Sequence, residues 1–239
     1  MLVFLDQFGY SAVPMELVER IMSGTSREVF SFMNWRDLNR YLTDETKWPG
    51  IDRAFGGPEW REVLSIKGGV RSQRFLQLYD EALRTRGKAS FSYSFSMHDQ
   101  NDQLLYWLVF CSNSDRGLEE MKKAMWSVDD TGQFRFSDKH SGQFNLLPGF
   151  DESWLADNLR SSLVGRQMTV GEIRHHVLTE TPCFKYTDSL AQLERNEEIA
   201  IISSPPGRRK GTFAKYVDDD RLVIRFINAP RSEQLSLLD

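Results

Sequence analysis

Apolar positions near the start of the chain predict two strands with a helix between them. Residues 2–5 (LVFL) form a wholly apolar run typical of a buried strand, and residues 28–33 (EVFSFM) are mainly β-branched and aromatic. Pro14 begins a helix whose apolar positions recur on one face, and Gly24 ends it. A strand, a helix and a second strand in this order predict two parallel neighbours, as in an α/β fold.

The middle of the chain predicts an antiparallel hairpin framed by two helices. Residues 90–97 alternate serine with aromatic side chains, residues 104–110 (LLYWLVF) are apolar throughout, and the segment DQND between them is rich in turn-forming residues. Amphipathic helices are expected over residues 71–86 and 118–128. We also expect short helices at 35–42 and 58–64, a loop at 47–57 and an irregular connector at 129–149.

This order of elements matches the second half of a class I methyltransferase-like, Rossmann-type sheet, in which a parallel pair is followed by an antiparallel hairpin. The first half of such a sheet supplies the remaining parallel strands and a glycine-rich turn for the cofactor, and the sequence shows neither before residue 2. The sequence therefore predicts a partial sheet with an apolar edge at residues 2–5. We expect a homodimer, a partner chain or a further N-terminal segment to cover this edge.

From about residue 150 the pattern is that of a winged helix-turn-helix, with three helices followed by a hairpin. Thr169 and Glu172 form a capping box at the start of the second helix, and a turn is expected at 165–169 before it. The expected helices are 155–163, 170–178 and a third that begins at Phe184 or Tyr186 and ends at Asn196, and the expected strands are 199–202, 212–216 and 222–227.

We place the domain boundary near Pro148-Gly149. Residues 1–148 then form a methyltransferase-like α/β half-domain, and residues 149–239 form a winged-helix domain. With 239 residues and 40% hydrophobic content, both can build a core.

Composition narrows the classes of function. The net charge of −4 gives no overall basic field for nucleic acid, so each basic patch must be judged locally. Cys111 and Cys183 lie far apart in the sequence, which favours free thiols in a reducing, cytoplasmic compartment. No apolar run approaches the roughly 20 residues of a membrane helix, so no membrane partner is expected.

Motif spacing argues against several kinds of site. The four histidines show no i,i+4 pair and join the two cysteines in no C-x-x-C pattern, so no metal site is expected. The chain has neither a P-loop nor a Gly-x-Ser-x-Gly elbow, and the glycine pairs Gly56-Gly57 and Gly68-Gly69 are isolated breakers of little weight.

A basic hairpin tip is the strongest binding signal. Arg208, Arg209 and Lys210 follow a Pro-Pro-Gly turn, where guanidinium and ammonium groups can bind phosphates. The preceding helix offers four further side chains for phosphates or base edges: Lys185, Tyr186, Thr187 and Gln192. The same helix also carries Asp188 and Glu194, so the alternative is a solvated turn in a protein-interaction winged helix.

The turn after the first strand is the candidate for chemistry. Asp6 could accept a hydrogen bond from an amine, and Phe8 or Tyr10 could stack on a base, as in amino-methyltransferases that hold an extruded base. We expect four neighbours to complete a cleft at the ends of the two parallel strands: Gln7, Gly9, Asn34 and Trp35. The alternative is that Asp6 caps the following helix and that Trp35 packs in the core.

Four segments together resemble the three-Cys-motif partner (TcmP) family. They are residues 4–22 (FLDQFGYSAVPMELVERIM), 28–42 (EVFSFMNWRDLNRYL), 104–138, which includes the run RGLEEMKKAMW, and 204–213 (SPPGRRKGTF). The resemblance covers nearly the whole chain. It implies a methyltransferase-type protein with a C-terminal winged-helix-like region, from a bacterial or phage mobile-element context. It also implies a three-Cys-motif protein as partner and DNA or RNA as the associated molecule.

Two departures from the family pattern bear on activity. The upstream glycine-rich segment of an S-adenosylmethionine site is missing, and Gln7 replaces the proline of the family's Asp-Pro-Phe-Gly turn. We therefore expect no cofactor on this chain alone, and S-adenosylmethionine only if the N-terminal half is supplied.

Three functions remain open from the sequence. The first is a nucleic-acid-associated, methyltransferase-like subunit that acts with a partner protein. The second is a non-catalytic protein-interaction adaptor, and the third is a truncated S-adenosylmethionine-dependent nucleic-acid methyltransferase.

Overall fold

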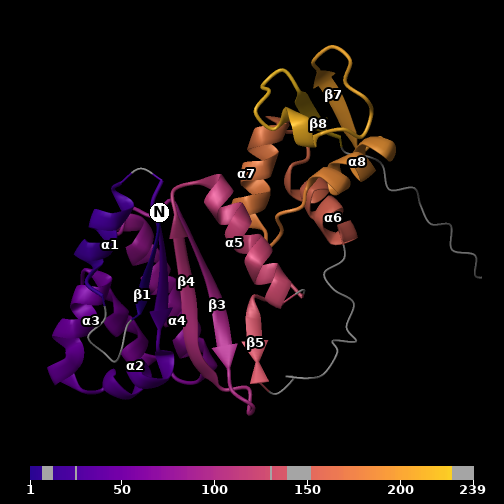
Figure 1. Ribbon diagram of the computed structural model, residues 1–239. Coiled ribbons are helices and arrows are strands. Elements are labelled where there is room, and N and C mark those ends of the chain that lie inside the picture. The colour runs from indigo at the N-terminus through magenta and orange to yellow at the C-terminus, as the bar shows by residue number, and fades with distance from the viewer. Residues whose placement is uncertain (7–12, 25, 130, 139–151, 228–239) are drawn as a thin grey trace, which may run out of the picture. The chain divides into compact units, whose positions relative to one another are not determined.

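The computed structural model describes residues 1–6, 13–24, 26–129, 131–138 and 152–227 (Figure 1). The chain divides into two compact units, Met1–Leu147 and Pro148–Asp239. Each unit has its own sheet and its own helices, so each is described by itself.

Unit 1 is an α/β unit built on a mixed five-stranded sheet with the order β1-β2-β4-β3-β5. β1 and β2 are parallel, β4 is antiparallel to both β2 and β3, and β5 is parallel to β3. The predicted parallel pair and the predicted hairpin are therefore confirmed. The strands are β1 (Leu2–Asp6), β2 (Glu28–Met33), β3 (Phe91–His98), β4 (Leu104–Ser112) and β5 (Arg135–Ser137).

Helices pack on both faces of this sheet, as Figure 1 shows. One face carries α1 (Met15–Met22), α2 (Trp35–Tyr41), α3 (Trp48–Phe55) and α4 (Gly69–Thr85), together with the 3₁₀ helices η1 (Glu45–Lys47) and η2 (Glu59–Ser65). Their apolar side chains form the main core with Val29, Met33 and Val109 of the sheet. On the other face, α5 (Asp115–Val128) packs Met125 against Phe95 and Phe110.

Two loop predictions in unit 1 are wrong. Residues 47–57 contain α3, because Pro49 stands in the first turn, where its missing N–H costs nothing, and Gly56 ends the helix at φ 68°. The connector at 129–149 contains β5, which adds a fifth strand to the sheet.

Residues 2–5 form the predicted strand, β1, but the prediction that this strand is buried is wrong. β1 is the edge strand, paired with β2 alone among the described strands. The side chains of Leu2 and Phe4 remain 55% and 57% exposed. They lie on the face of the sheet that carries α5, but α5 packs against β3 and β4 and leaves β1 uncovered. Val3 and Leu5, on the other face, are half-buried. The expected apolar edge is therefore present.

Over its described residues, 152–227, unit 2 combines three α-helices with a small antiparallel sheet of order β6-β8-β7. The elements are α6 (Glu152–Ser162), β6 (Gln167–Thr169), α7 (Val170–Glu180), α8 (Thr187–Arg195), β7 (Ile199–Ser203) and β8 (Val223–Phe226). The capping box is confirmed, since Thr169 Oγ1 accepts from the Glu172 N–H and the Glu172 carboxylate accepts from the Thr169 N–H. The turn expected at 165–169 instead includes β6, the third strand of this sheet.

The strand predicted at residues 212–216 is wrong. A turn and the 3₁₀ helix η4 (Ala214–Tyr216) occupy this stretch, so the hairpin partner of β7 is β8. Gly207 and Gly211, at φ 76° and 79°, break the extended conformation on both sides of the basic residues. The side chain of Phe213 is 1% exposed and is packed into the core of the unit. Residues 204–222 consequently form one long connection, which we call the basic loop.

Candidate functional site

The carboxyl ends of β1 and β2 lie at one edge of the sheet in unit 1. The two strands are parallel, and Asp6 pairs in register with Phe32, two residues before Asn34. β2 and β3 are both antiparallel to β4, so they run in the same direction. β3 therefore also ends at this edge, at His98. Asp6 is exposed there. Four of the predicted site residues, Gln7, Phe8, Gly9 and Tyr10, lie outside the described residues.

Asn34 and Trp35 stand at the start of α2. The Asn34 amide accepts from the Asp37 N–H at 3.1 Å and donates to the Asp37 carboxylate at 2.7 Å, so it caps the helix. Trp35 is 7% exposed and packs its ring against those of Phe75 and Trp107, with centroids 5.2 and 5.4 Å away. Trp35 is thus a core residue that lies at the end of the sheet.

A pocket of about 630 Å³ opens at this end of unit 1, and we call it the strand-end pocket. α2, the start of α4 and the β3–β4 hairpin enclose it. Its apolar wall consists of Trp35, Leu76, Leu104 and Trp107, and its polar wall includes Asn39, Arg71, Ser72, Ser96, His98, Asp102 and Gln103 beside Gly68 and Gly69. Sequence reasoning identified Trp35 but missed the other wall residues. The pair Gly68-Gly69 directly before an amphipathic helix was the available signal.

Hydrogen bonds fix the polar wall of the strand-end pocket. Arg71 donates from Nε to the Val63 carbonyl at 3.1 Å and from Nη1 to Asn39 Oδ1 at 3.3 Å. His98 Nδ1 lies 3.2 Å from the Asp102 carbonyl oxygen. The Asp102 carboxylate is paired with Arg135 at 2.5 Å. Arg71 therefore supplies the positive charge of the pocket, and the nearby acid is already neutralised.

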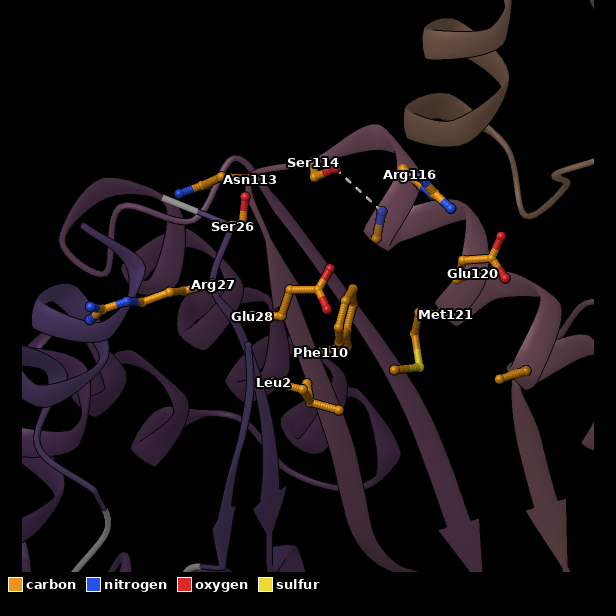
Figure 2. Close-up of a pocket in the computed structure, with 12 residues that line it drawn as sticks. Leu2, Ser26, Arg27, Glu28, Phe110, Asn113, Ser114, Arg116, Glu120 and Met121 are labelled. Carbon is orange, nitrogen blue, oxygen red and sulfur yellow. Dashed lines mark hydrogen bonds between the residues drawn. The ribbon is translucent and has the colours of Figure 1, made fainter. Parts of the chain in front are cut away.

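A second hollow, of about 550 Å³, lies at the opposite end of the sheet, and we call it the α5 groove. Figure 2 shows Leu2, Glu28 and Phe110 on the strands and Glu120 and Met121 on α5 around it. The groove adjoins the exposed β1 strand, because Leu2 lines it. It is a continuation of the uncovered apolar edge.

In unit 2, Arg208 is held inside the protein. Its Nη1 and Nη2 donate to the two carboxylate oxygens of Glu194 at 2.8 and 2.7 Å, and its guanidinium lies 4.6 Å from the centre of the Phe213 ring. The Gly211 N–H donates to the same carboxylate at 2.6 Å. The phosphate contact expected of Arg208 is therefore not supported, because both terminal nitrogens of its guanidinium already donate to Glu194.

The remaining basic candidates differ in accessibility. Arg209, Lys210 and Lys185 are exposed, and Thr187 and Gln192 are half-buried on α8. Tyr186 is 7% exposed, so it is not placed for a base contact. Because the Glu194 carboxylate holds both Arg208 and Gly211, the stretch of backbone that carries the two exposed cations is held next to α8.

The charge of Glu194 depends on this arrangement. Burial raises the pKa of its carboxyl, but the bonds from Arg208 and from the Gly211 N–H outweigh burial and hold the pKa below its usual 4.5. Over residues 152–227, eleven lysines and arginines balance eleven acids. Any anion attraction by unit 2 is therefore local to exposed cations such as Arg209 and Lys210.

Neither metal binding nor thiol chemistry is supported by the part of the chain that the structure describes. No group of three or more His, Cys, Asp or Glu side chains there could hold a metal ion. Both cysteines are free and buried, and burial raises the pKa of Cys111 to about 12, which keeps it an unreactive thiol. No described helix is long and apolar enough to cross a membrane.

Comparison with known proteins identifies no relative. No family model, no curated protein and no solved structure matches the chain.

Proposed function

We propose that this chain is a nucleic-acid-associated, methyltransferase-like subunit of the TcmP type, which acts together with a partner polypeptide. The observation that carries the proposal is the strand order of unit 1, β1-β2-β4-β3. A parallel pair continued by a hairpin, whose second strand inserts next to the pair, is the order of the second half of a class I methyltransferase sheet. Open α/β sheets bind ligands at the carboxyl ends of their strands, and the strand-end pocket lies at that end.

The element order of unit 2 supports a winged helix. A helix, a short strand, two helices and two further strands follow one another, and the first strand joins the hairpin sheet. In this reading α8 is the recognition helix and the basic loop is the wing. The buried Arg208–Glu194 pair fixes the wing on the helix, so Arg209 and Lys210 are pre-positioned for phosphates.

In this proposal the partner polypeptide supplies the cofactor half of the methyltransferase. The described turns from β2 to α2 and from β4 to α5 contain no glycine, so neither is the glycine-rich turn of a cofactor site. We therefore assign this chain the substrate side of the reaction and derive no step through the cofactor. The uncovered edge of β1 is where a strand of the partner would continue the sheet.

A protein-interaction adaptor is the second candidate. It is favoured by one observation, the exposed apolar side chains of Leu2 and Phe4 beside the α5 groove. The adaptor reading predicts partner binding without any affinity for nucleic acid.

Fluorescence anisotropy with labelled duplex DNA, single-stranded DNA and RNA tests the proposal. We expect the chain to bind at least one of the three, and the variant R209E/K210E to bind it about tenfold or more weakly. The control R20E/R53E reverses two exposed arginines of unit 1 and gives the same net charge, so it should bind like wild type. Equal binding by the wing variant and the wild type, or no binding of any probe, contradicts the proposal.

A further inference from the structure

The strand-end pocket has the size and the two-sided chemistry of a small-molecule site. Its volume of about 630 Å³ falls in the range of roughly 300–1,000 Å³ that ligand pockets occupy. Trp35, Leu76, Leu104 and Trp107 make one wall apolar. The other wall carries side chains that donate or accept hydrogen bonds, and such mixed walls fix the orientation of a ligand.

The apolar wall suits a flat ring. Trp35 and Trp107 are packed against each other in the core, with 7% and 4% of their surface exposed, so their positions do not depend on a ligand. Leu76 and Leu104 are half-buried, and both line the pocket. A planar heterocycle would bury its apolar faces against these side chains.

The polar wall supplies the groups that read a base edge. Ser96 offers a hydroxyl, Gln103 offers an amide, and His98 offers its second ring nitrogen because Nδ1 lies against the Asp102 carbonyl. Ser96 and His98 come from the end of β3 and Gln103 from the turn directly before β4, so the hairpin holds them together. Donors and acceptors of this kind match the exocyclic groups of a nucleobase.

The mouth of the pocket is suited to an anion. Arg71 uses Nε and Nη1 for the Val63 carbonyl and Asn39, and its Nη2 donates no hydrogen bond to another described residue. Next to it, Gly68 and Gly69 present bare backbone, since a Cβ built on either would meet no atom within 4 Å. An oxyanion can therefore approach both the guanidinium and the backbone. Asp102 does not repel it strongly because Arg135 neutralises that carboxylate.

We infer that the strand-end pocket binds a single nucleotide. The base lies against the apolar wall and is read by the hairpin residues, while the phosphate sits between Arg71 and the backbone of Gly68 and Gly69. This inference deepens the proposed function, on which it rests, by naming the ligand class of the substrate side.

Isothermal titration calorimetry of the full chain with AMP, GMP, CMP and UMP tests the inference. We expect one-to-one binding of at least one of them, and binding of its nucleoside about tenfold or more weakly, because the nucleoside lacks the charged hydrogen bonds. The variant R71A should lose the preference for the nucleotide and keep the affinity for the nucleoside. The control K67A removes an exposed lysine that does not line the pocket and should change neither affinity.

A second variant separates loss of the site from loss of the fold. Gly69 is the first residue of α4 and has open space around it, so G69E places a carboxylate at a helix N-terminus, where it stabilises the helix. The same carboxylate occupies the phosphate position. We expect G69E to keep or raise the melting temperature and to bind the nucleotide at least about tenfold more weakly.

Three results would overturn the inference. They are no binding by any of the four nucleotides at millimolar concentration, an unchanged nucleotide preference in R71A and G69E, or inorganic phosphate binding as tightly as the nucleotide. The variant R209E/K210E should bind the nucleotide like wild type. Nucleic-acid binding without nucleotide binding therefore contradicts the pocket alone, and nucleotide binding without nucleic-acid binding contradicts the proposed function alone.

Discussion

The guanidinium of Arg208 donates two hydrogen bonds to the carboxylate of Glu194, and more than nine-tenths of each side chain is buried. This pair joins the basic loop to α8 across 14 residues of sequence. It turns the most basic stretch of the chain into a fixed part of unit 2. It also divides the three basic residues by role, since Arg208 holds the loop and Arg209 and Lys210 remain exposed.

The first prediction concerns the stability of unit 2. The variant R208A leaves the Glu194 carboxylate buried without its partner, so we expect the free energy of unfolding to fall by about 3–5 kcal/mol. The matched change R209A removes an exposed arginine from the same loop and should alter it by less than about 0.5 kcal/mol. Urea unfolding followed by circular dichroism measures both. Equal stability of the two variants would show that Arg208 does not anchor the basic loop.

The second prediction follows from the lowered pKa of Glu194. A carboxyl whose pKa is lower in the folded than in the unfolded state contributes stability above its unfolded value, near 4.5, and this contribution is lost as the pH falls through the folded pKa. We expect the melting temperature to drop below about pH 4.5, and E194Q to show a smaller drop over the same window. Parallel acid titrations by differential scanning fluorimetry make the comparison, and identical slopes would refute it.

The third prediction tests the edge of unit 1. The Met1 carbonyl accepts from the Glu28 N–H. Because the N–H and C=O groups of successive strand residues point to opposite sides, those of Leu2 and Phe4 point away from β2. We expect wild-type protein to self-associate through this edge and L2K/F4K to remain monomeric, since edge lysines block strand pairing. Sedimentation velocity over a concentration series shows the difference. V70K, on the exposed start of α4, is the control, and monomeric wild-type protein at every concentration would contradict the prediction.

The fourth prediction assigns chemistry to the end of β1. We expect the exposed Asp6 carboxylate to accept a hydrogen bond from an exocyclic amine of the substrate. In a complex reconstituted with the partner that supplies the cofactor half, D6A should abolish methyl transfer and leave nucleic-acid binding intact. E16A changes an exposed acid of α1 and should retain transfer. Undiminished transfer by D6A would remove Asp6 from the reaction.

Local signals in the sequence were sufficient for much of the fold. The hairpin of β3 and β4 follows from alternation and turn residues, and α7 follows from the Thr169–Glu172 capping box. α3 was missed because Trp48-Pro49-Gly50 contains two residues that usually break helices, although proline is well suited to a first turn. The strand expected at 212–216 failed because Phe213 is anchored in the core and the neighbouring glycines turn the chain.

The candidate sites were harder to predict because they depend on partners distant in sequence. Nothing near Arg208 shows that Glu194 occupies its guanidinium, so a run of three cations is interpreted as three exposed cations. Likewise, Arg71 and His98 line the same pocket only because α4 and the β3–β4 hairpin pack at the same end of the sheet. The place of Trp35 at this end could be predicted, because it follows from the parallel pairing of β1 and β2 alone.

The salt dependence of nucleic-acid binding tests the central claim most directly. Each phosphate contact on duplex DNA contributes about 0.9 to the slope of log K against log salt concentration. If Arg209 and Lys210 bind phosphates, R209A/K210A should bind more weakly and with a slope about 1.8 units shallower than wild type. A slope equal to that of wild type would show that these residues touch no phosphate, and the nucleic-acid-associated function would be wrong.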